Sequence, residues 1–219
     1  MSNLKLDNVT LVVLTSVKIP ENIRALKISM NGIDFGKVKF ISHIKPEGLP
    51  EGVIYEYCDQ LTSIDHFSEY TFLKLHKHID TDYMILVHHD GYIARPEQWS
   101  DEFYDYDYIG APWEYSETAY ITDYGEHVDV GNGGFRMCTK KLLELPTKLG
   151  LKLEERQGYY ADDGNICVYH RKTFLENGIK YAPVKIAAKF STEKWIEGIS
   201  VDESFGFHGF IWQNNRKYI

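Results

Sequence analysis

An apolar run that ends abruptly in polar residues could hold a metal ion. Residues 83–87 read Tyr-Met-Ile-Leu-Val, and His88, His89, Asp90 and Gly91 follow directly. Carboxylate oxygens and imidazole nitrogens bind divalent cations, and such an ion would stabilise the charge that builds up on a departing diphosphate. Asp90 is the main candidate ligand. A plain Asp-Gly turn at the end of a strand explains the same residues about equally well.

The spacing of His88 and Asp90 bears on the identity of the metal. Side chains two apart in a strand project to the same side, so these two would do so if the strand continued through them. His88 then either binds the metal beside Asp90 or contacts a ribose or phosphate. Because Mn²⁺ tolerates a nitrogen ligand better than Mg²⁺, we expect Mn²⁺.

A second group of candidate residues follows later in the chain. The segment Gly131-Asn132-Gly133-Gly134-Phe135 lacks the Lys-Ser/Thr of a phosphate-binding loop. If the segment precedes a strand, its glycines would let the backbone approach a sugar ring, and Asn132 would hydrogen-bond to the sugar hydroxyls. A tight turn or bulge explains the same glycines equally well. Trp113 either stacks on an acceptor sugar or packs inside the protein.

Strand-like and helix-like segments alternate in a way that would position these residues. The uncharged apolar run at 83–87 suits a strand covered on both faces, as in a parallel sheet between helices, where ligands bind beyond the carboxyl ends of the strands. We predict strands over residues 10–14, 38–41 and 83–90. Helices are predicted from Pro20 to Met30, from Ser68 to His78, from Lys140 to a stop at Pro146, and after Asp162-Asp163-Gly164 as far as Asn177-Gly178. Residues 114–129 are predicted to be a loop, either a functional flap or simply mobile.

Composition excludes several classes of protein. A net charge of −8 is the wrong sign for a broad nucleic-acid interface, so we expect no nucleic-acid partner. No apolar stretch approaches the ~20 residues that span a bilayer, and residues 1–8 lack a secretory signal, which predicts a cytoplasmic protein. The basic aromatic residues 212–219 could contact a membrane surface or a partner, although a tail without a fixed structure is the better expectation. The three widely spaced cysteines indicate neither a disulfide framework nor a metal knuckle.

Taken together, these segments resemble the GT-A class of nucleotide-sugar glycosyltransferases. More closely, they resemble a glycosyltransferase-like family of bacterial surface-polysaccharide loci and some large viruses. The resemblance spans nearly the whole chain and rests on five motifs: Tyr55-Glu56-Tyr57-Cys58, Tyr108-Ile109-Gly110-Ala111-Pro112-Trp113, Gly131-Asn132-Gly133-Gly134-Phe135, Asp163-Gly164-Asn165-Ile166-Cys167 and Phe205-Gly206-Phe207-His208-Gly209.

The resemblance implies a role for further residues. GT-A enzymes usually carry Asp-x-Asp where this chain has His88-His89-Asp90, which puts metal dependence in question. A late His-Gly supplies a metal ligand in galactosyltransferases of this fold, which points to His208. Thr15 and Ser16, after the first strand, would face the nucleoside, with Lys18 near phosphate. A routine strand-to-helix turn explains these three nearly as well.

The acidic pair Asp162-Asp163 bears on the mechanism. Inverting transfer needs a carboxylate that takes the proton of the acceptor hydroxyl, and in the galactosyltransferase pattern the second acid of such a pair is that base. Asp163 is therefore the expected base, and Asp162 is expected to cap the helix or contact the acceptor. Acids at a helix start can equally serve only to cap free N–H groups and complement the helix dipole.

We therefore expect one GT-A-like α/β domain over residues 1–219, with a mostly parallel sheet flanked by helices. Donor binding is expected in about residues 8–113, and acceptor binding and catalysis in about 114–219. The predicted activity is sugar transfer from a UDP or other nucleoside diphosphate sugar to a glycan or lipid-linked acceptor, in polysaccharide biosynthesis. The alternatives are a metal-dependent nucleotide-sugar hydrolase, and a non-catalytic glycan-binding domain.

Overall fold

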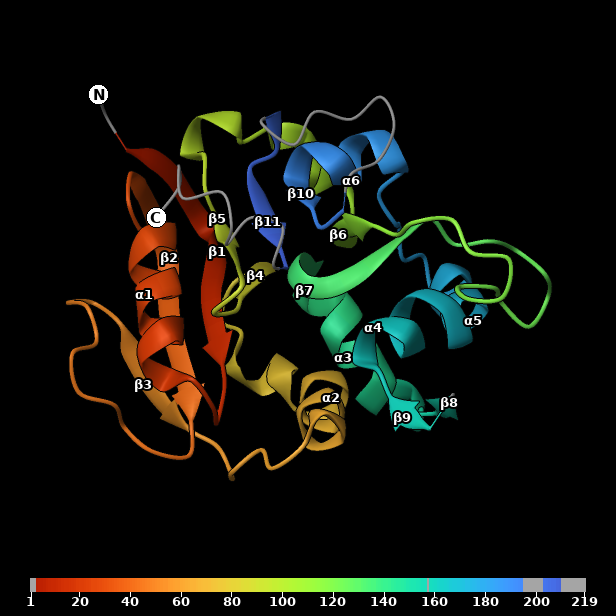
Figure 1. Cartoon of the computed structure of the whole chain (residues 1–219), viewed down its shortest axis with the longest axis horizontal. Coiled ribbons are helices and arrows are strands. Elements are labelled where there is room, and N and C mark those ends of the chain that lie inside the picture. The colour runs from red at the N-terminus through yellow and green to blue at the C-terminus, as the bar shows by residue number, and fades with distance from the viewer. Residues whose placement is uncertain (1–2, 157, 195–202, 210–219) are drawn as a thin grey trace.

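A six-stranded mixed sheet forms the centre of the protein (Figure 1). The computed structural model describes residues 3–156, 158–194 and 203–209. The sheet order is β3-β2-β1-β4-β7-β6. The strands run over these residues: β1 Leu4–Leu14, β2 Ile33–Ser42, β3 Ile54–Tyr57, β4 Tyr83–Val87, β6 Tyr108–Pro112 and β7 Val130–Thr139. Neighbours from β3 to β4 pair in parallel, whereas β7 is antiparallel to both β4 and β6, so the predicted mostly parallel sheet is confirmed.

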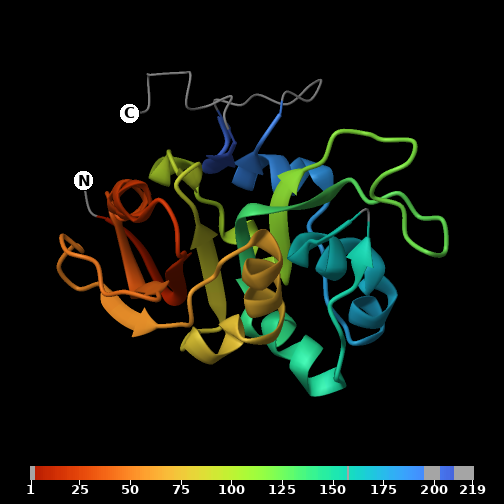
Figure 2. The ribbon, with the colours of Figure 1, turned by 60° about the horizontal axis from the view of Figure 1, so that its bottom comes forward.

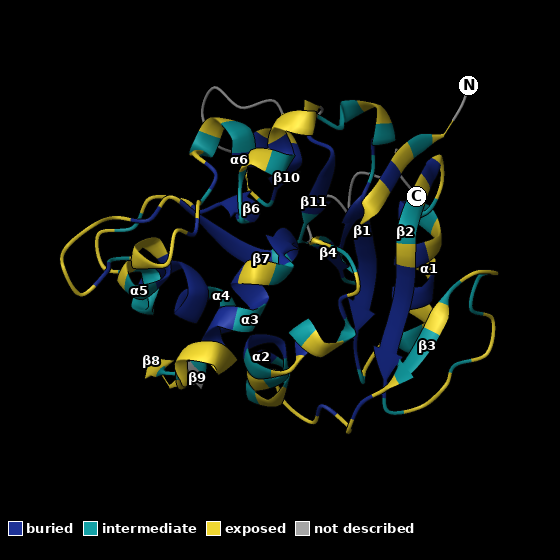
Figure 3. Ribbon diagram, turned by 180° about the vertical axis from the view of Figure 1, so that it is seen from behind, coloured by how far each residue is buried: buried dark blue, intermediate teal, exposed yellow. Residues whose placement is uncertain are grey.

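Helices cover both faces of the sheet (Figures 1 and 2). Helices α1 (Ile19–Ser29) and α6 (Val184–Phe190) pack into one apolar cluster with alternate residues of β1, such as Leu11 and Val13. Helices α2 (Ile64–Leu73) and α3 (Lys140–Leu149) pack on the other face, against Val12 and Leu14. Because side chains alternate along a strand, a run apolar at every position is buried on both sides, as the dark central strands in Figure 3 show.

A small second sheet brings the end of the chain to the carboxyl end of β4. Strand β5 (Gly91–Ile93) follows β4 after a turn and pairs antiparallel with β11 (Gly206–His208), which pairs in turn with β10 (Ser191–Thr192). The register sets His208 opposite Gly91. Two residues more than a hundred positions apart are thereby held side by side, and no local pattern indicates this pairing.

Other connections complete the fold. Three 3₁₀ turns occur at η1 (Leu75–His78), η2 (Pro96–Gln98) and η3 (Asp101–Asp105), and a short hairpin joins β8 (Glu155–Arg156) to β9 (Tyr159–Tyr160). Residues 114–129 form the expected loop, apart from an isolated bridge between Ile121 and His127. Within the described part of the chain, no helix is both long and apolar enough to cross a membrane. The prediction for residues 212–219 lies outside the described residues.

Three predicted helices differ from the structure. The helix predicted from Ser68 begins earlier, because Ser63 caps it by accepting a hydrogen bond from the His66 amide, and it becomes 3₁₀ after Leu73. Helix α3 does not stop at Pro146 but includes it. Proline lacks the amide hydrogen that would bond within the helix, and burial of the apolar face of the helix outweighs this loss. Gly150, with φ 64°, caps the end of the helix.

The last predicted helix is interrupted. It consists of α4 (Asp162–Gly164), the π-helical turn η4 (Asn165–Tyr169) and α5 (Arg171–Glu176). The amide of His170 donates to the Asn165 carbonyl, five residues back, and the Asn165 side chain bonds to the carbonyls of Glu154 and Ala161. These side-chain bonds favour the wider turn, a feature that is frequent at functional sites.

A buried ion pair joins β7 to α4. Arg136, in the middle of β7, is fully buried, and its guanidinium lies 2.5 Å from a carboxylate oxygen of Asp162, which is 6% exposed. Neither charge has access to bulk water that would stabilise it alone. The pair therefore fixes the start of the helical segment against the sheet.

Removing one partner of this pair should destabilise the protein strongly. We expect Arg136→Met to lower the free energy of unfolding by about 3–5 kcal/mol, because it leaves Asp162 buried without its cation. The double variant Arg136→Met/Asp162→Asn, which removes both charges, should recover most of that loss. Urea denaturation measures both values, and equal stabilities of the single and double variants would contradict the role of the pair.

Candidate functional site

A tight turn presents the first group of candidate residues. The strand predicted to reach Asp90 ends at Val87, and His88 and Gly91 close a two-residue turn, with amide-to-carbonyl distances of 2.7 and 3.1 Å in the two directions. His89 and Asp90 form the tip. The strand alternation that would set His88 and Asp90 on one side therefore does not apply. Instead, this two-residue turn directs Asp90 toward β11.

Asp90 and His208 face each other across the pairing of β5 with β11. The distance from Asp90 Oδ1 to His208 Nε2 is 3.8 Å, and the Gly209 amide donates to the Asp90 carbonyl at 2.8 Å. The other imidazole nitrogen, Nδ1, lies 3.2 Å from a Glu193 carboxylate oxygen. Burial alone would lower the pKa of His208, but the two carboxylates outweigh burial and raise it. The His208 imidazole is therefore held between the carboxylates of Asp90 and Glu193.

This arrangement fits a metal site only in part. Among residues 3–156, 158–194 and 203–209, no three His, Cys, Asp or Glu side chains gather closely enough to hold an ion by themselves. Asp90 and His208 nevertheless point ligand atoms at each other, and the Glu193 contact matches the carboxylate–histidine–metal arrangement that fixes imidazole ligands elsewhere. The residues thus fit an ion that takes its remaining ligands from phosphate and water.

His88 lies in the wall of a cavity. Burial, followed by the nearby His208, lowers the pKa of His88 to about 3, so its ring is neutral at pH 7. The ring packs edge-on against Phe67, with 5.2 Å between centroids. Within the described part of the chain its Nε2 atom is buried and has no hydrogen-bond partner. A neutral imidazole with one unused nitrogen can bind a polar ligand atom.

The cavity beside His88 has a volume of about 320 Å³ and lies between the end of β1 and the start of α2. Its walls combine apolar groups with hydroxyls and an amide: Leu14, Thr15, Ser16, Val17, Asn22, Leu61, Thr62, Ser63, Ile64, Phe67, His88 and His89. Such a mixture suits a ligand with a flat ring and polar edges.

The hydroxyls of Thr15 and Ser16 are already engaged. Thr15 Oγ1 donates to the Val17 carbonyl and accepts from the Val17 amide, and Ser16 Oγ accepts from the Leu61 amide at 2.8 Å. They shape the strand-to-helix turn, which was one of the two predicted alternatives. Lys18 has left-handed backbone, with φ 47°, and its Nζ lies 2.8 Å from His89 Nε2 at the edge of the cavity.

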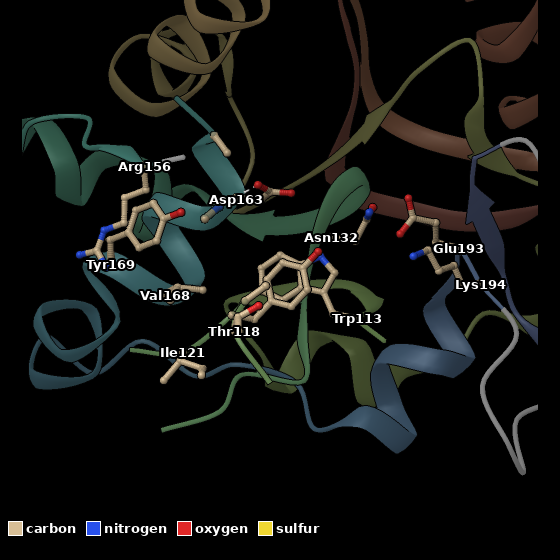
Figure 4. A pocket seen from close by; sticks show the side chains of 14 residues that line it. Trp113, Thr118, Ile121, Asn132, Arg156, Asp163, Val168, Tyr169, Glu193 and Lys194 are labelled. Atoms are coloured by element: carbon tan, nitrogen blue, oxygen red, sulfur yellow. Dashed lines mark hydrogen bonds between the residues drawn. The ribbon is translucent and has the colours of Figure 1, made fainter. Parts of the chain in front are cut away.

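A second cavity, of about 400 Å³, contains Asp163 (Figure 4). Asp163, Asn132 and Trp113 line it together with residues of the 114–129 loop and with Arg156, Tyr169, Glu193 and Lys194. Figure 4 shows the Asp163 carboxylate and the Asn132 side chain projecting toward the same space. Two of the predicted groups, the acidic pair and the glycine-rich segment, are thereby brought together.

The two acids of the pair differ sharply in environment. Asp162 is neutralised by Arg136 and neither caps the helix nor reaches the cavity, so the structure gives it a role other than the predicted ones. Asp163 accepts hydrogen bonds from the amides of Gly133 and Gly164, at 2.9 and 2.7 Å. Burial, together with the charge of Asp162, raises the pKa of Asp163 to about 6. A carboxylate with that pKa can accept a proton near neutral pH.

The glycine-rich segment lies within β7 rather than ahead of a strand. Asn132 Oδ1 accepts from the Gly134 amide at 3.1 Å, which holds its side chain over the cavity. An added Cβ at Gly133 would lie 2.4 Å from Arg136 Nη1 and 2.9 Å from the Asp163 Cβ, and at Gly134 it would lie 2.0 Å from His208 Nε2. These glycines make room for the two functional side chains.

Trp113 is mainly a packing residue in this structure. It is 8% exposed, and Tyr120 stacks on it with 4.0 Å between ring centroids and 10° between planes. An open stacking face, one of the two predicted alternatives, is therefore not presented.

Arg136, Glu193 and Tyr120 complete the candidate site and were missed from the sequence. A lone arginine in the otherwise apolar Phe135-Arg136-Met137-Cys138 was a signal for a buried ion pair. Nothing in the local pattern marked Glu193 or Tyr120.

Replacing Gly134 should displace His208. In Gly134→Ala the new methyl group would overlap the imidazole, so we expect the ring to leave its place beside Gly91. Nuclear Overhauser contacts between the His208 Hδ2 and Gly91 Hα protons should disappear. The control Gly48→Ala adds a methyl group that meets nothing within 4 Å; its φ of 75° costs stability in a distant loop, but the contacts should remain. Unchanged contacts in Gly134→Ala would show that this glycine does not set the position of His208.

Two solved structures are similar to this one. A glycosyltransferase involved in the glycosylation of the major capsid of PBCV-1 has a TM-score of 0.51 and 14% identity, over 91% of each chain. A mannosyltransferase from Pyrobaculum calidifontis, in complex with GDP-Man and Mn²⁺, has a TM-score of 0.46 and 13% identity, over 80% of this chain and 53% of its own. No curated protein matches the sequence. The model of the family described as "Protein of unknown function (DUF5672)" matches residues 59–208, and the chain belongs to that family.

Proposed function

We propose that this protein is a glycosyltransferase that moves a sugar from a nucleoside diphosphate donor to a hydroxyl of a glycan or lipid-linked acceptor. The observation that carries the proposal is Asp163, a carboxylate with a pKa raised to about 6 that lines a cavity of ligand size. A fold shared with a solved glycosyltransferase supports the same class of reaction at the level of fold. Surface-polysaccharide synthesis is the process we assign to it.

Asp163 is the proposed general base of an inverting transfer. The acceptor hydroxyl would give its proton to the Asp163 carboxylate as its oxygen forms a bond to the anomeric carbon. The bond from that carbon to the diphosphate oxygen breaks, and its electron pair leaves with the nucleoside diphosphate. The amides of Gly133 and Gly164 fix the carboxylate for this step, and Arg136 keeps the charge of Asp162 compensated beside it.

The donor is proposed to lie in the cavity beside His88, with its base between Leu61 and Phe67. Its diphosphate would then approach the β4–β5 turn, where Lys18 adds positive charge and His89 adds an imidazole that can hydrogen-bond. Asp90 and His208 are the residues that would hold a divalent ion, with Mn²⁺ favoured by the imidazole ligand. When bound, that ion supplies charge neutralisation for the leaving diphosphate.

Loss of the Asp163 carboxylate should abolish transfer without weakening donor binding. We expect Asp163→Asn to lower kcat by about 10²- to 10⁴-fold, the usual contribution of a positioned base. Because the raised pKa keeps the carboxylate protonated at low pH, the wild-type rate should rise with pH up to about 6 and level off above it. The loss of kcat and the pH dependence of the rate are both measured as release of nucleoside diphosphate from a panel of nucleotide sugars, with glycosides as acceptors.

The exposed Asp105→Asn is the control for this experiment and should leave the rate unchanged. A rate for Asp163→Asn near that of the wild type would exclude Asp163 as the base. Turnover that is indifferent to added acceptor would instead indicate a hydrolase.

Metal binding should depend on the facing pair. Asp90→Ala and His208→Ala are each expected to weaken binding of Mn²⁺ in the presence of nucleotide. Glu193→Gln, which changes the partner of the imidazole, should weaken it about 10- to 100-fold. Electron paramagnetic resonance of free Mn²⁺ measures the affinities, with the exposed His66→Ala as control. Equal affinities of Asp90→Ala and the wild type would remove the metal from the proposed site.

A further inference from the structure

The indole of Trp113 has only one face that a ligand could reach. On its other face lies Gly131, where an added Cβ would be 2.2–2.7 Å from three atoms of the six-membered ring. The backbone of β7 thus forms a fixed floor under the indole. Tyr120 covers the remaining face in a nearly parallel stack, and both rings line the cavity that contains Asp163. Figure 4 shows the Trp113 indole at the side of this cavity.

Tyr120 holds this position with unfavourable backbone geometry. Its φ is 58°, in the left-handed region that a bulky residue seldom adopts, and Lys18 is the only other non-glycine residue with a positive φ in the described part of the chain. Strain of this kind persists where surrounding contacts enforce it and concentrates at ligand sites and switches. Tyr120 is also 37% exposed, so the contact with Trp113 does not enclose it.

Ion pairs fasten the loop that carries Tyr120. Glu114 lies 3.1 Å from Lys194, Asp123 contacts Arg156 at 2.8 and 3.1 Å, and Glu126 lies 3.3 Å from Arg171. All three carboxylates are well exposed, so salt screens these pairs and each contributes little alone. Salt-screened ion pairs therefore hold the outside of the loop, beside the Trp113–Tyr120 stack and the backbone hydrogen bond from Val128 to Tyr120. Thr118, Ala119, Tyr120 and Ile121 form a wall of the cavity.

We infer that Tyr120 occupies the place of an acceptor sugar ring on Trp113, and that loop 114–129 must lift it away before a pyranose can stack there. The inference rests on the proposed function, because it makes this cavity the acceptor site. A phenol ring and the apolar face of a pyranose are similar in size and can cover the same indole face. Binding of the acceptor then competes with an internal contact, and removing that contact favours the binding-competent state.

The test is binding of methyl pyranosides, without nucleotide, followed by saturation-transfer NMR. Tyr120→Ala should bind the best glycoside of a panel roughly 2- to 10-fold more tightly than the wild type, the factor expected from one stacked ring pair. Trp113→Ala should lose binding. Raising NaCl from 50 to 500 mM should tighten binding to the wild type and leave Tyr120→Ala unchanged. The control Tyr115→Ala removes a loop tyrosine that is 70% exposed and should behave as the wild type.

Weaker binding by Tyr120→Ala would overturn the inference, because the sugar would then stack on Tyr120 itself. Failure of every glycoside to bind the wild type and Tyr120→Ala would overturn it as well. Should Trp113→Ala not fold, the sign of the Tyr120→Ala effect still gives the answer. Nucleotide binding is measured separately, so a protein that binds glycosides but no nucleotide would refute the transferase and leave the role of Tyr120 standing.

Discussion

The candidate site depends on close approach of side chains to the backbone of β7. Three glycines of this strand make room for side chains of the site: Gly131 for the Trp113 indole, Gly133 for Arg136 and Asp163, and Gly134 for His208. Any Cβ at these positions would lie within 3 Å of the group it faces. Because β7 is a central strand of the sheet, it cannot move aside without disturbing β4 and β6. The strand therefore fixes the distance between the acidic and the histidine-bearing parts of the site.

The buried charge of Arg136 complements this constraint. It neutralises Asp162 and leaves the adjacent Asp163 as the carboxylate that reaches the cavity. Two neighbouring acids with the same sequence environment thereby acquire different chemistry, one as a structural anion and one with a raised pKa. Separation of this kind is how a protein assigns different roles to paired carboxylates.

The sequence predicted those parts that depend on local pattern. The apolar run at 83–87 indicated a strand buried on both faces, and the helix at Pro20 began within one residue of the prediction. Prediction from the sequence failed where residues distant in the chain determine the local conformation. The pairing of β5 with β11 is absent from any local pattern, and the π-helical turn after Asp163 depends on side-chain bonds from Asn165 to Glu154 and Ala161. The contacts of Thr15 and Ser16 likewise depend on neighbours such as Leu61.

The proposed donor site is the cavity between β1 and α2, which would bind the nucleotide of a sugar donor. Calorimetric titration of UDP, GDP and CMP in the presence of Mn²⁺ tests it most directly. We expect one nucleotide to bind with 1:1 stoichiometry, and Thr62→Trp, which would fill the cavity, to abolish binding. Asp163→Asn should bind it as the wild type does. No binding of any nucleotide, or binding that Thr62→Trp leaves intact, would contradict it.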